Sequence, residues 1–410
     1  MKVLAVAYAC DPRVGSEAGI GWNWVRQIAS RYDCWVITRE NNVERVKTWA
    51  QDQGLDRLHV IGFDLPPWMR FWKRGRRGAL LYFYLWQLGT TRCARALDRE
   101  HNFDVVHHLT FASSWIPSGL SPLNKPFVWG PVGQHPRVPD RFLLASDLKL
   151  RLAELVKSLV RRFLPACDPF MRRTLRSADC ILSLGQEGRG KLRSVDDRPV
   201  ESMLACGAPV PELAEDRWTR GGPFRVVYAG RLVDLKGVCL AVDAFARAAG
   251  TRGDMELHLA GDGPRRDWLE RRARRLGIWS RVHFHGHLPQ GDTLALMESA
   301  DAFLFPSFEG AGMVVVEALA RGCPVVCLDF GGPGQMVGDD RGLRVPLGTR
   351  DQTVAGLATA IASLHADEDL RLRLARGAHA WARRYATWDY KGTRLAEIYS
   401  MAMNRRRRAS

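Results

Sequence analysis

Short apolar runs alternate with longer amphipathic stretches along the first half of this 410-residue chain. Strand-like apolar runs occupy residues 3–9, 34–38, 58–63, 104–109, 126–130 and 179–185. Helix-like stretches with one polar face lie between them, for example at 19–32 and 43–53. Because parallel strands separated by helices form a doubly wound sheet, the pattern predicts an α/β, Rossmann-like domain. The first run is at the bare minimum length for a secretory signal, and a buried first strand explains it better.

The pattern breaks at residues 203–223, which are rich in Pro and Gly, and we interpret this stretch as a domain linker. Strand-like runs resume at 224–230, 255–261, 281–286, 301–306 and 324–330, each followed by helix-like sequence. The sequence therefore predicts two Rossmann-like doubly wound domains, at 1–205 and 206–385, facing each other across a cleft. Residues 386–410 are expected to form a C-terminal helix that crosses back to the first domain and carries a basic tail. Ligands of such sheets bind at the carboxyl ends of the strands.

The amino-acid composition is that of an ordinary globular protein except for an unusually high positive charge. The net charge is +16, and much of it lies in residues 68–99 and in the four arginines at 405–408. Such a basic balance indicates an anionic partner: a membrane lipid, a nucleic acid or a phosphorylated substrate. No helix-turn-helix, zinc-finger or RNA-binding signature accompanies the charge, so we expect no nucleic-acid partner.

The nine cysteines are scattered, mostly within apolar runs, and none forms a C-x-x-C pair. This pattern is typical of reduced, buried cysteines in a cytoplasmic protein, not of a disulfide or zinc framework. No run of 18 apolar residues exists, so we expect no membrane-spanning helix.

Several expected strand-to-helix loops carry candidate chemistry. Gly15, in "DPRVGSEAGIG", could let backbone N–H groups approach a phosphate, or could mark a plain turn. Arg231 and Lys236, in "YAGRLVDLKG", follow the first strand of the second domain. They could neutralise a diphosphate, or could be solvated surface charges.

Two acids stand eight positions apart in "FLFPSFEGAGMVVVEALARG". Glu309 falls in a loop after an apolar strand, whereas Glu317 falls inside an apolar helix. Since an unpaired buried carboxylate is costly, Glu317 must accept hydrogen bonds, either from the hydroxyls of a sugar or from an arginine or backbone amides. The turn at residues 330–334 is a second candidate anion site.

Four motifs, "GSEAGIG", "AGRLVDLKG", "LAGDGP" and "PSFEGAGMVVVEALARGCPVV", occur in this order. The sequence resembles glycosyltransferase family 4, whose members are retaining nucleotide-sugar transferases with the GT-B fold. The resemblance covers most of the chain. It implies a hexosyltransferase-class enzyme that needs no metal or other cofactor. "GSEAGIGWNW" and "WGPVG" resemble bacterial members that build exopolysaccharide or lipopolysaccharide.

The resemblance also implies roles for individual residues. Glu317 is expected to bind the ribose of the donor and Glu309 its sugar, while Arg231 and Lys236 neutralise the diphosphate. Backbone groups at Gly15, Gly310, Gly312, Met313 and Val314 complete the expected donor site. The expected donor is a UDP- or GDP-linked sugar, and the expected acceptor is a glycan.

"DVVHHLTF" places two histidines at a strand end, and strand alternation points them to opposite faces. We expect His107, the family position, to be catalytic near the acceptor rather than His108. The sequence departs from the family pattern at Ala311 and Gln335, and we expect these departures to alter the contacts with the donor sugar.

Two segments mix apolar and cationic residues: 66–89, which contains "PWMRFWKRGRRG", and 148–163, which has apolar residues at helical spacing. Both suit an anionic membrane surface at the cytoplasmic face, and a lipid-diphosphate-linked acceptor would fit such a location. A helix packed on the first domain with its charges outward is the alternative. The competing functions are a nucleotide-sugar epimerase or hydrolase of similar fold and a non-catalytic scaffold subunit.

Overall fold

The computed structural model describes residues 1–13, 15–73, 75, 78–113, 115–133, 138–142, 167–183, 200–213, 221–250 and 253–409. These residues form two compact units. Unit 1 contains the described residues of 1–133, 167–183, 200–205 and 388–409, and unit 2 contains those of 138–142 and 206–387.

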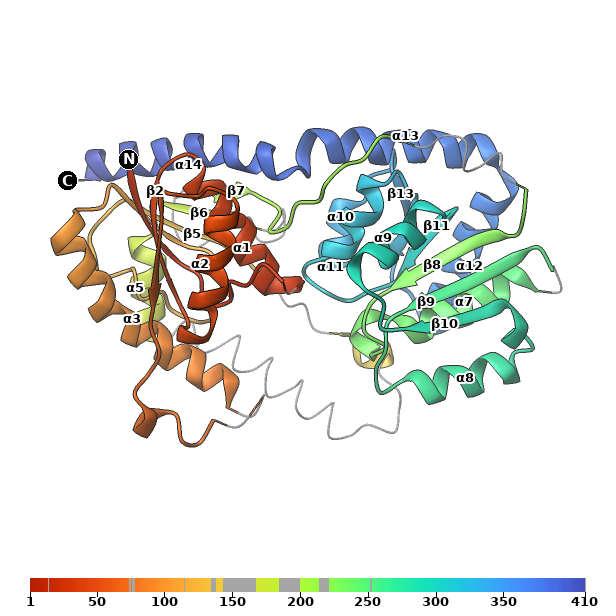
Figure 1. Cartoon of the computed structure of the whole chain (residues 1–410). Coiled ribbons are helices and arrows are strands. Elements are labelled where there is room, and N and C mark those ends of the chain that lie inside the picture. The colour runs from red at the N-terminus through yellow and green to blue at the C-terminus, as the bar shows by residue number, and fades with distance from the viewer. Residues whose placement is uncertain are drawn as a thin grey trace. The chain divides into compact units, whose positions relative to one another are not determined.

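Unit 1 is built on a seven-stranded sheet with the strand order β3-β2-β1-β4-β5-β6-β7 (Figure 1). Its strands are β1 (Lys2–Val6), β2 (Asp33–Thr38), β3 (Leu58–Gly62), β4 (Val105–His108), β5 (Phe127–Val132), β6 (Cys180–Ser183) and β7 (Val200–Ser202). All neighbouring strands pair in parallel. The first apolar run is therefore a central, buried strand, as its pattern predicts.

The helices of unit 1 are α1 (Ser16–Ala29), α2 (Val43–Asp52), α3 (Ala79–His101), α5 (Pro169–Ser177) and α14 (Trp388–Ala409). Helix α1 begins after Gly15 and carries Glu17 in its first turn, where a negative charge interacts favourably with the helix dipole. A Cβ atom at Gly21 would lie 2.0 Å from the Ala9 carbonyl oxygen. Helix α1 passes so close to the loop after β1 that no side chain fits at this position. Packing alone therefore requires Gly21, one of the glycines of "GSEAGIG".

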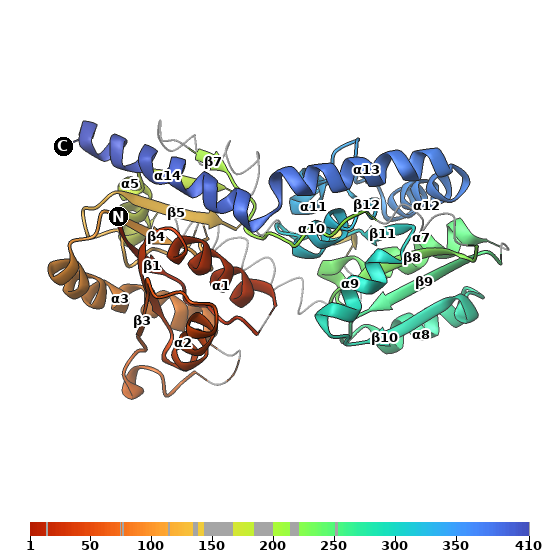
Figure 2. The ribbon, with the colours of Figure 1, turned by 45° about the horizontal axis from the view of Figure 1, so that its top comes forward.

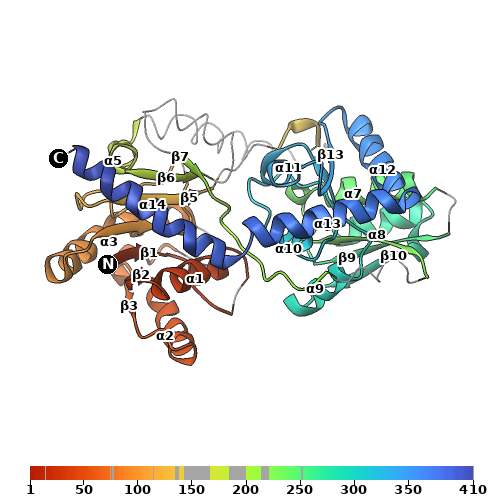
Figure 3. The same cartoon turned by 90° about the horizontal axis from the view of Figure 1, so that it is seen from above.

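The C-terminal helix α14 packs on unit 1, where it contacts α1, β4, β5 and β6 (Figures 2 and 3). Lys391 donates to the Leu204 carbonyl oxygen at 3.0 Å, and the Arg406 guanidinium lies 2.9 Å from the Asp179 carboxylate. The arginines at 405–408 were expected to form a tail after the helix. They instead belong to its last turns, since Arg406 has an acidic partner on unit 1.

Unit 2 holds a six-stranded, fully parallel sheet with the order β10-β9-β8-β11-β12-β13. Its strands are β8 (Phe224–Ala229), β9 (Met255–Ala260), β10 (Val282–Gly286), β11 (Ala302–Phe305), β12 (Val325–Leu328) and β13 (Gly342–Val345). Its helices are α7 (Val238–Ala249), α8 (Arg266–Arg275), α9 (Gln290–Glu298), α10 (Met313–Ala320), α11 (Gly331–Met336), α12 (Arg350–Ala366) and α13 (Glu368–Tyr385). The prediction of two doubly wound Rossmann-like sheets is confirmed.

Some details differ from the prediction or lie outside it. Strands β7 and β13 were not predicted, because each is short and carries a charged residue. Residues 138–142 precede the predicted boundary at 205 but belong to unit 2, where the ring of Phe142 lies 5.1 Å from that of Phe308. The predicted amphipathic helix at 148–163 lies outside the described residues.

Among the described residues, no helix combines the length and the apolar character needed to cross a bilayer. Helix α3 contains the longest apolar run but has 23 residues that include several charges.

Candidate active site

Three loops meet at the carboxyl end of the unit 2 sheet, following β8, β9 and β11. Gly237, with φ of +66°, ends the first loop, and a Cβ atom there would lie 1.8 Å from the Pro306 carbonyl oxygen after β11. A Cβ at Gly261 would lie 2.1 Å from the Gly230 carbonyl oxygen. The Phe308 N–H donates to the Leu235 carbonyl oxygen at 2.9 Å. Glycines at these positions therefore allow backbone contact that places the side chains of the three loops together.

Lys236 and Glu309 form an ion pair at this end of the sheet. The Nζ atom of Lys236 lies 2.7 Å from an oxygen of Glu309, and the two side chains are 23% and 24% exposed. The Glu309 N–H donates to the Ser307 hydroxyl at 3.2 Å, which fixes the loop that carries the acid. Sequence analysis assigned these residues to different parts of a donor, and the structure brings them into direct contact.

Arg231 lies in the same loop as Lys236 and is exposed. Its side chain has no ion-pair partner among the residues that the structure describes. By contrast, Asp234 in this loop is paired with Arg265, with an Nε–Oδ1 distance of 2.9 Å. Arg231 therefore presents an uncompensated positive charge at the carboxyl end of the sheet.

Helix α10 begins directly after the loop that carries Glu309. Gly312 is its N-cap, and Met313 and Val314 are its first two residues. The first N–H groups of a helix lack intrahelical acceptors and attract negative charge. The Glu309 carbonyl oxygen accepts from Gly332 at 2.8 Å, so the stretch containing Gly310 is held against α11. Helix α11, at the predicted second anion site, has only six residues, so we do not assign an anion site to its N-terminus.

Glu317 lies one turn further along α10 and is half-buried. Its carboxylate accepts a hydrogen bond from the Gln290 side chain at 2.9 Å. Burial raises the pKa of Glu317, while this hydrogen bond and the charge of Arg321 lower it. The hydrogen-bond donor that we expected for Glu317 is thus the side-chain amide of Gln290, at the start of α9. Sequence reasoning missed Gln290, because 27 positions separate it from Glu317.

In unit 1, Gly15 is exposed, and a Cβ atom there would meet nothing within 4 Å. Its φ of −66° is ordinary, so neither backbone conformation nor packing among the described residues requires a glycine. Glu17, which sequence analysis also missed, accepts from the Phe111 N–H at 2.6 Å and ties α1 to the loop after β4. The phosphate-binding role of Gly15 stays a prediction.

Both histidines of β4 are fully buried. The two ring nitrogens of His107 lie 2.8 Å from the Tyr399 hydroxyl of α14 and 2.8 Å from the Gly130 carbonyl oxygen. His108 contacts the Thr110 carbonyl oxygen through Nε2, and its Nδ1 has no hydrogen-bond partner among the described residues. Burial lowers the pKa of His107 to about 3 and that of His108 to about 4. The catalytic role of His107 near an acceptor stays a prediction, and both of its ring nitrogens already have internal partners.

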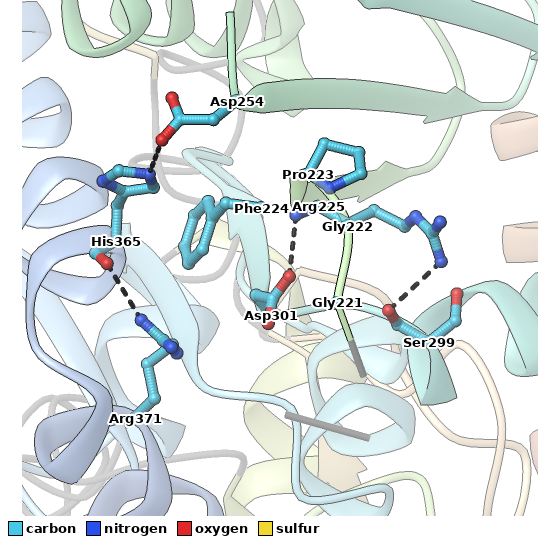
Figure 4. Close-up of a pocket in the computed structure, with 10 residues that line it drawn as sticks. All are labelled: Gly221, Gly222, Pro223, Phe224, Arg225, Asp254, Ser299, Asp301, His365 and Arg371. Carbon is cyan, nitrogen blue, oxygen red and sulfur yellow. Dashed lines mark hydrogen bonds and ion pairs between the residues drawn. The ribbon is translucent and has the colours of Figure 1, made fainter. Parts of the chain in front are cut away.

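A pocket of about 360 Å³ opens at the amino end of the unit 2 sheet (Figure 4). Its lining consists of Gly221, Gly222, Pro223, Phe224, Arg225, Asp254, Ser299, Asp301, His365 and Arg371. Its polar side chains bind one another or nearby backbone, as His365 does with Asp254 at 2.9 Å. Strand β8 separates this pocket from Arg231 and Lys236, so we do not assign it to a donor.

Comparison with known proteins identifies the class. Residues 212–381 match the family model of the glycosyl transferases group 1, and this part of the chain belongs to that family. Glycogen synthase of Mycobacterium tuberculosis is 36% identical over 231 residues, which cover 50% of this chain and 55% of that protein. The lipopolysaccharide core biosynthesis glycosyltransferase LpsE of Rhizobium meliloti is 38% identical over 156 residues, or 38% of this chain and 43% of that protein. The chain thus matches about half the length of these curated relatives.

The fold extends beyond the matched segment. The solved structure of Alr3699/HepE from Anabaena in complex with UDP has a TM-score of 0.64 at 20% identity. The match covers 98% of this chain and 100% of that one. The chain therefore has the two Rossmann-like domains of the GT-B fold, and the family resemblance inferred from the four motifs is confirmed.

Proposed function

We propose that this protein is a retaining, metal-independent glycosyltransferase that transfers a hexose from a UDP- or GDP-linked donor to a glycan. The observation that carries the proposal is the cationic group at the carboxyl end of the unit 2 sheet. Arg231 is exposed and has no acidic partner among the described residues, and Lys236, five positions later in the same loop, contacts Glu309. The names of the relatives, a glycogen synthase and a lipopolysaccharide core glycosyltransferase, support a glycan acceptor.

The proposed chemistry follows from where charge develops. When the bond between the anomeric carbon and the diphosphate oxygen breaks, negative charge accumulates on the leaving diphosphate. Arg231, Lys236 and the first N–H groups of α10 would stabilise that charge. We propose that these fixed charges replace a metal ion, so transfer should persist in the presence of a chelator.

The ion pair of Lys236 with Glu309 would separate when the donor binds, and each side chain would then contact a different part of the donor. Lys236 would turn toward the diphosphate and leave the Glu309 carboxylate to accept hydrogen bonds from the donor sugar. Glu317, which the Gln290 amide holds at 2.9 Å, would bind the ribose hydroxyls. The assignment of Glu309 to the sugar and Glu317 to the ribose rests on the family resemblance and on the position of both acids around the start of α10.

A screen of thermal stability with UDP, GDP and their sugars tests the donor proposal. A ligand that binds the native state raises the melting temperature by mass action. We expect a clear shift with one nucleotide, and no shift with any of them would contradict the proposal. Product analysis with the bound donor and a glycan then separates transfer from epimerisation or hydrolysis, and no chemistry at all would favour a scaffold.

Glu309→Gln tests the catalytic assignment. We expect it to abolish transfer, because a neutral amide cannot balance the charge that develops on the sugar in the transition state. Stability should fall by no more than about 1 kcal/mol, since solvent still reaches both side chains of this ion pair, which are 23% and 24% exposed. Glu270→Gln is the matched control, as Glu270 is 26% exposed and pairs with Arg266 at 3.1 Å. Near-normal turnover of Glu309→Gln would refute its role.

We further propose that the acceptor is lipid-linked, in exopolysaccharide or lipopolysaccharide synthesis, and that unit 1 rests on the cytoplasmic face of the membrane. Trp68 and Phe71 are 72% and 77% exposed, and Leu80 and Leu81 are also exposed. Exposed aromatic residues within a strongly basic segment favour an anionic interface.

The variant Trp68→Ser/Phe71→Ser tests membrane contact by sedimentation with anionic and neutral vesicles. Because each buried aromatic contributes about 1.5–3 kcal/mol, partitioning should fall roughly 10-fold or more. Trp279→Ser, which removes a 41% exposed tryptophan from unit 2, should not change it. Equal partitioning of the double variant and the parent protein would refute the proposed membrane surface.

A further inference from the structure

Four side chains gather on one face of β9 and β10, at the free edge of the unit 2 sheet. Glu256 and His258 are two residues apart on β9 and therefore share a face. His283 pairs in register with His258 from β10, and His285 follows two residues later. We call Glu256, His258, His283 and His285 the edge cluster. Figure 2 shows β10 beside β9, with helix α8 running along them.

The cluster contains three side chains with the separation of metal ligands. One ligand atom from each of Glu256, His258 and His283 lies within 4.8 Å of the other two. Glu256 oxygens lie 3.3 Å from His258 Nε2 and 3.7 Å from His283 Nε2. Ligand atoms around a tetrahedral zinc ion lie roughly 3.3 Å apart, because Zn–N and Zn–O bonds are about 2.0–2.2 Å long. The rings of His258 and His283 would have to turn for both Nε2 lone pairs to face one ion, because the rings now stack with their planes 26° apart.

The imidazole ring of His283 supplies an independent indication. The His283 side chain is 40% exposed, but its Nε2 atom is itself buried and has no hydrogen-bond partner among the described residues. The ring of His283 stacks on that of His258, with centroids 4.6 Å apart and planes 26° apart. A buried ring nitrogen without a partner is costly, and a bound cation at the Glu256 carboxylate would satisfy it.

His285 occupies the position of an outer partner. The register of β10 against β9 shifts between Phe284 and Gly286, so His285 is the extra residue of a bulge. Bulges re-aim a side chain, and here His285 Nε2 lies 2.9 Å from His258 Nδ1. A metal-bound histidine normally donates its other ring N–H to a carboxylate, a backbone carbonyl or water, and His285 Nε2 would take the place of that acceptor here. His258 would bind through Nε2 and donate from Nδ1 to His285.

We propose that the edge cluster is a binding site for a late first-row divalent cation of the Zn²⁺ type, held by Glu256, His258 and His283. Two imidazoles and one carboxylate favour Zn²⁺, Co²⁺ or Ni²⁺ over Mg²⁺ or Ca²⁺, which prefer oxygen ligands. Arg225, the neighbour of Glu256 in register on β8, opposes the positive charge and should limit the affinity. Among the described strands, β10 pairs with β9 alone, so the ion would link this edge strand more firmly to the sheet. This site is separate from the proposed donor chemistry, which needs no metal.

Metal titration of the untagged full chain, freed of metal with a chelator, tests the proposal. We expect one equivalent of Zn²⁺ to bind and raise the melting temperature, and one Co²⁺ to give the visible absorption of a low-coordinate site. Mg²⁺ should give neither signal. His258→Gln and His283→Gln should weaken binding more than the about 10–100-fold expected for His285→Gln. His287→Gln is the matched control, because His287 is exposed just beyond β10 and lies outside the cluster.

Melting curves of the metal-free variants show whether they fold. A second measurement needs no variant: Zn²⁺ should protect His258 and His283 of the parent chain from diethyl pyrocarbonate, leaving His287 reactive. Absence of Zn²⁺ binding by the parent chain, or equal binding by the His258→Gln/His283→Gln double variant, would overturn the proposal. So would full reactivity of His258 and His283 at saturating Zn²⁺.

Discussion

The two sheets of this protein treat the polar residues at their carboxyl ends in opposite ways. In unit 2, Lys236 and Glu309 contact each other while remaining about one quarter exposed, and Arg231 is exposed. In unit 1, His107 and His108 are fully buried. The partners of His107 are Tyr399 of α14 and the Gly130 backbone.

The difference separates residues that are available to a ligand from residues that hold the fold. A side chain whose hydrogen-bonding capacity is used internally can bind a substrate only after the structure rearranges. Charged side chains that solvent still reaches, such as Lys236 and Glu309, can exchange one partner for another at a cost of about 1 kcal/mol or less. Three changes test this contrast, and they are given from the largest expected effect to the smallest.

Lys236→Ala should lower the rate of transfer strongly and leave unit 2 folded. Removing one preorganised charge that faces a developing negative charge costs about 10²–10³ in kcat. Arg272→Ala is the matched control, since Arg272 pairs with Asp243 at 2.8 Å outside the three loops. Steady-state kinetics and melting temperatures of both variants are the measurements. Equal kcat values for Lys236→Ala and the control would contradict the role of the ion pair.

Glu317→Gln should weaken nucleotide binding about 10–100-fold, because hydrogen bonds to a charged acceptor contribute about 1.5–3 kcal/mol. Stability should not fall, since burial raises the pKa of Glu317 and so disfavours its charged form. Calorimetric titration with the nucleotide identified in the thermal screen measures the affinity. Glu298→Gln on α9, where the carboxylate is 50% exposed, should bind as the parent does. Unchanged affinity of Glu317→Gln would remove the residue from the proposed site.

The histidines of unit 1 should appear in the pH dependence of stability. Burial lowers the pKa of His107 to about 3 and of His108 to about 4, whereas unfolded histidine titrates near 6.5. Between these values the unfolded chain binds more protons, so the free energy of unfolding falls as the pH falls from about 6.5 toward 4. Each histidine contributes a slope of up to about 1.4 kcal/mol per pH unit.

Urea unfolding of the parent chain, His108→Gln and His287→Gln at several pH values measures that slope. His108→Gln should lose up to about 1.4 kcal/mol per pH unit of it, and the exposed His287 should matter little. An unchanged slope in His108→Gln would mean that His108 takes up its proton without unfolding, as a residue open to solvent would.

Sequence patterns located most of both sheets. The runs at 224–230, 255–261, 301–306 and 324–330 became β8, β9, β11 and β12, because strands buried on both faces require continuous apolar sequence. A search for continuous apolar runs misses β7 and β13, because their segments "VES" and "GLRV" are short and partly polar. Alternation along "DVVHHL" indicated that the two histidines point to opposite faces of the strand. It could not indicate that both residues are fully buried in the described structure.

The sequence by itself determined the fold class, the family and the identity of the candidate donor residues, since these depend on local periodicity and on motifs within one loop. Only the tertiary structure decided which of those residues touch. Lys236 and Glu309 are 73 positions apart and meet because Gly237 lets the loop after β8 reach the backbone after β11. Arg406 became part of a packed helix because Asp179, 227 positions away, lies beside it. Contacts between distant segments depend on how whole elements pack, and no local pattern records that.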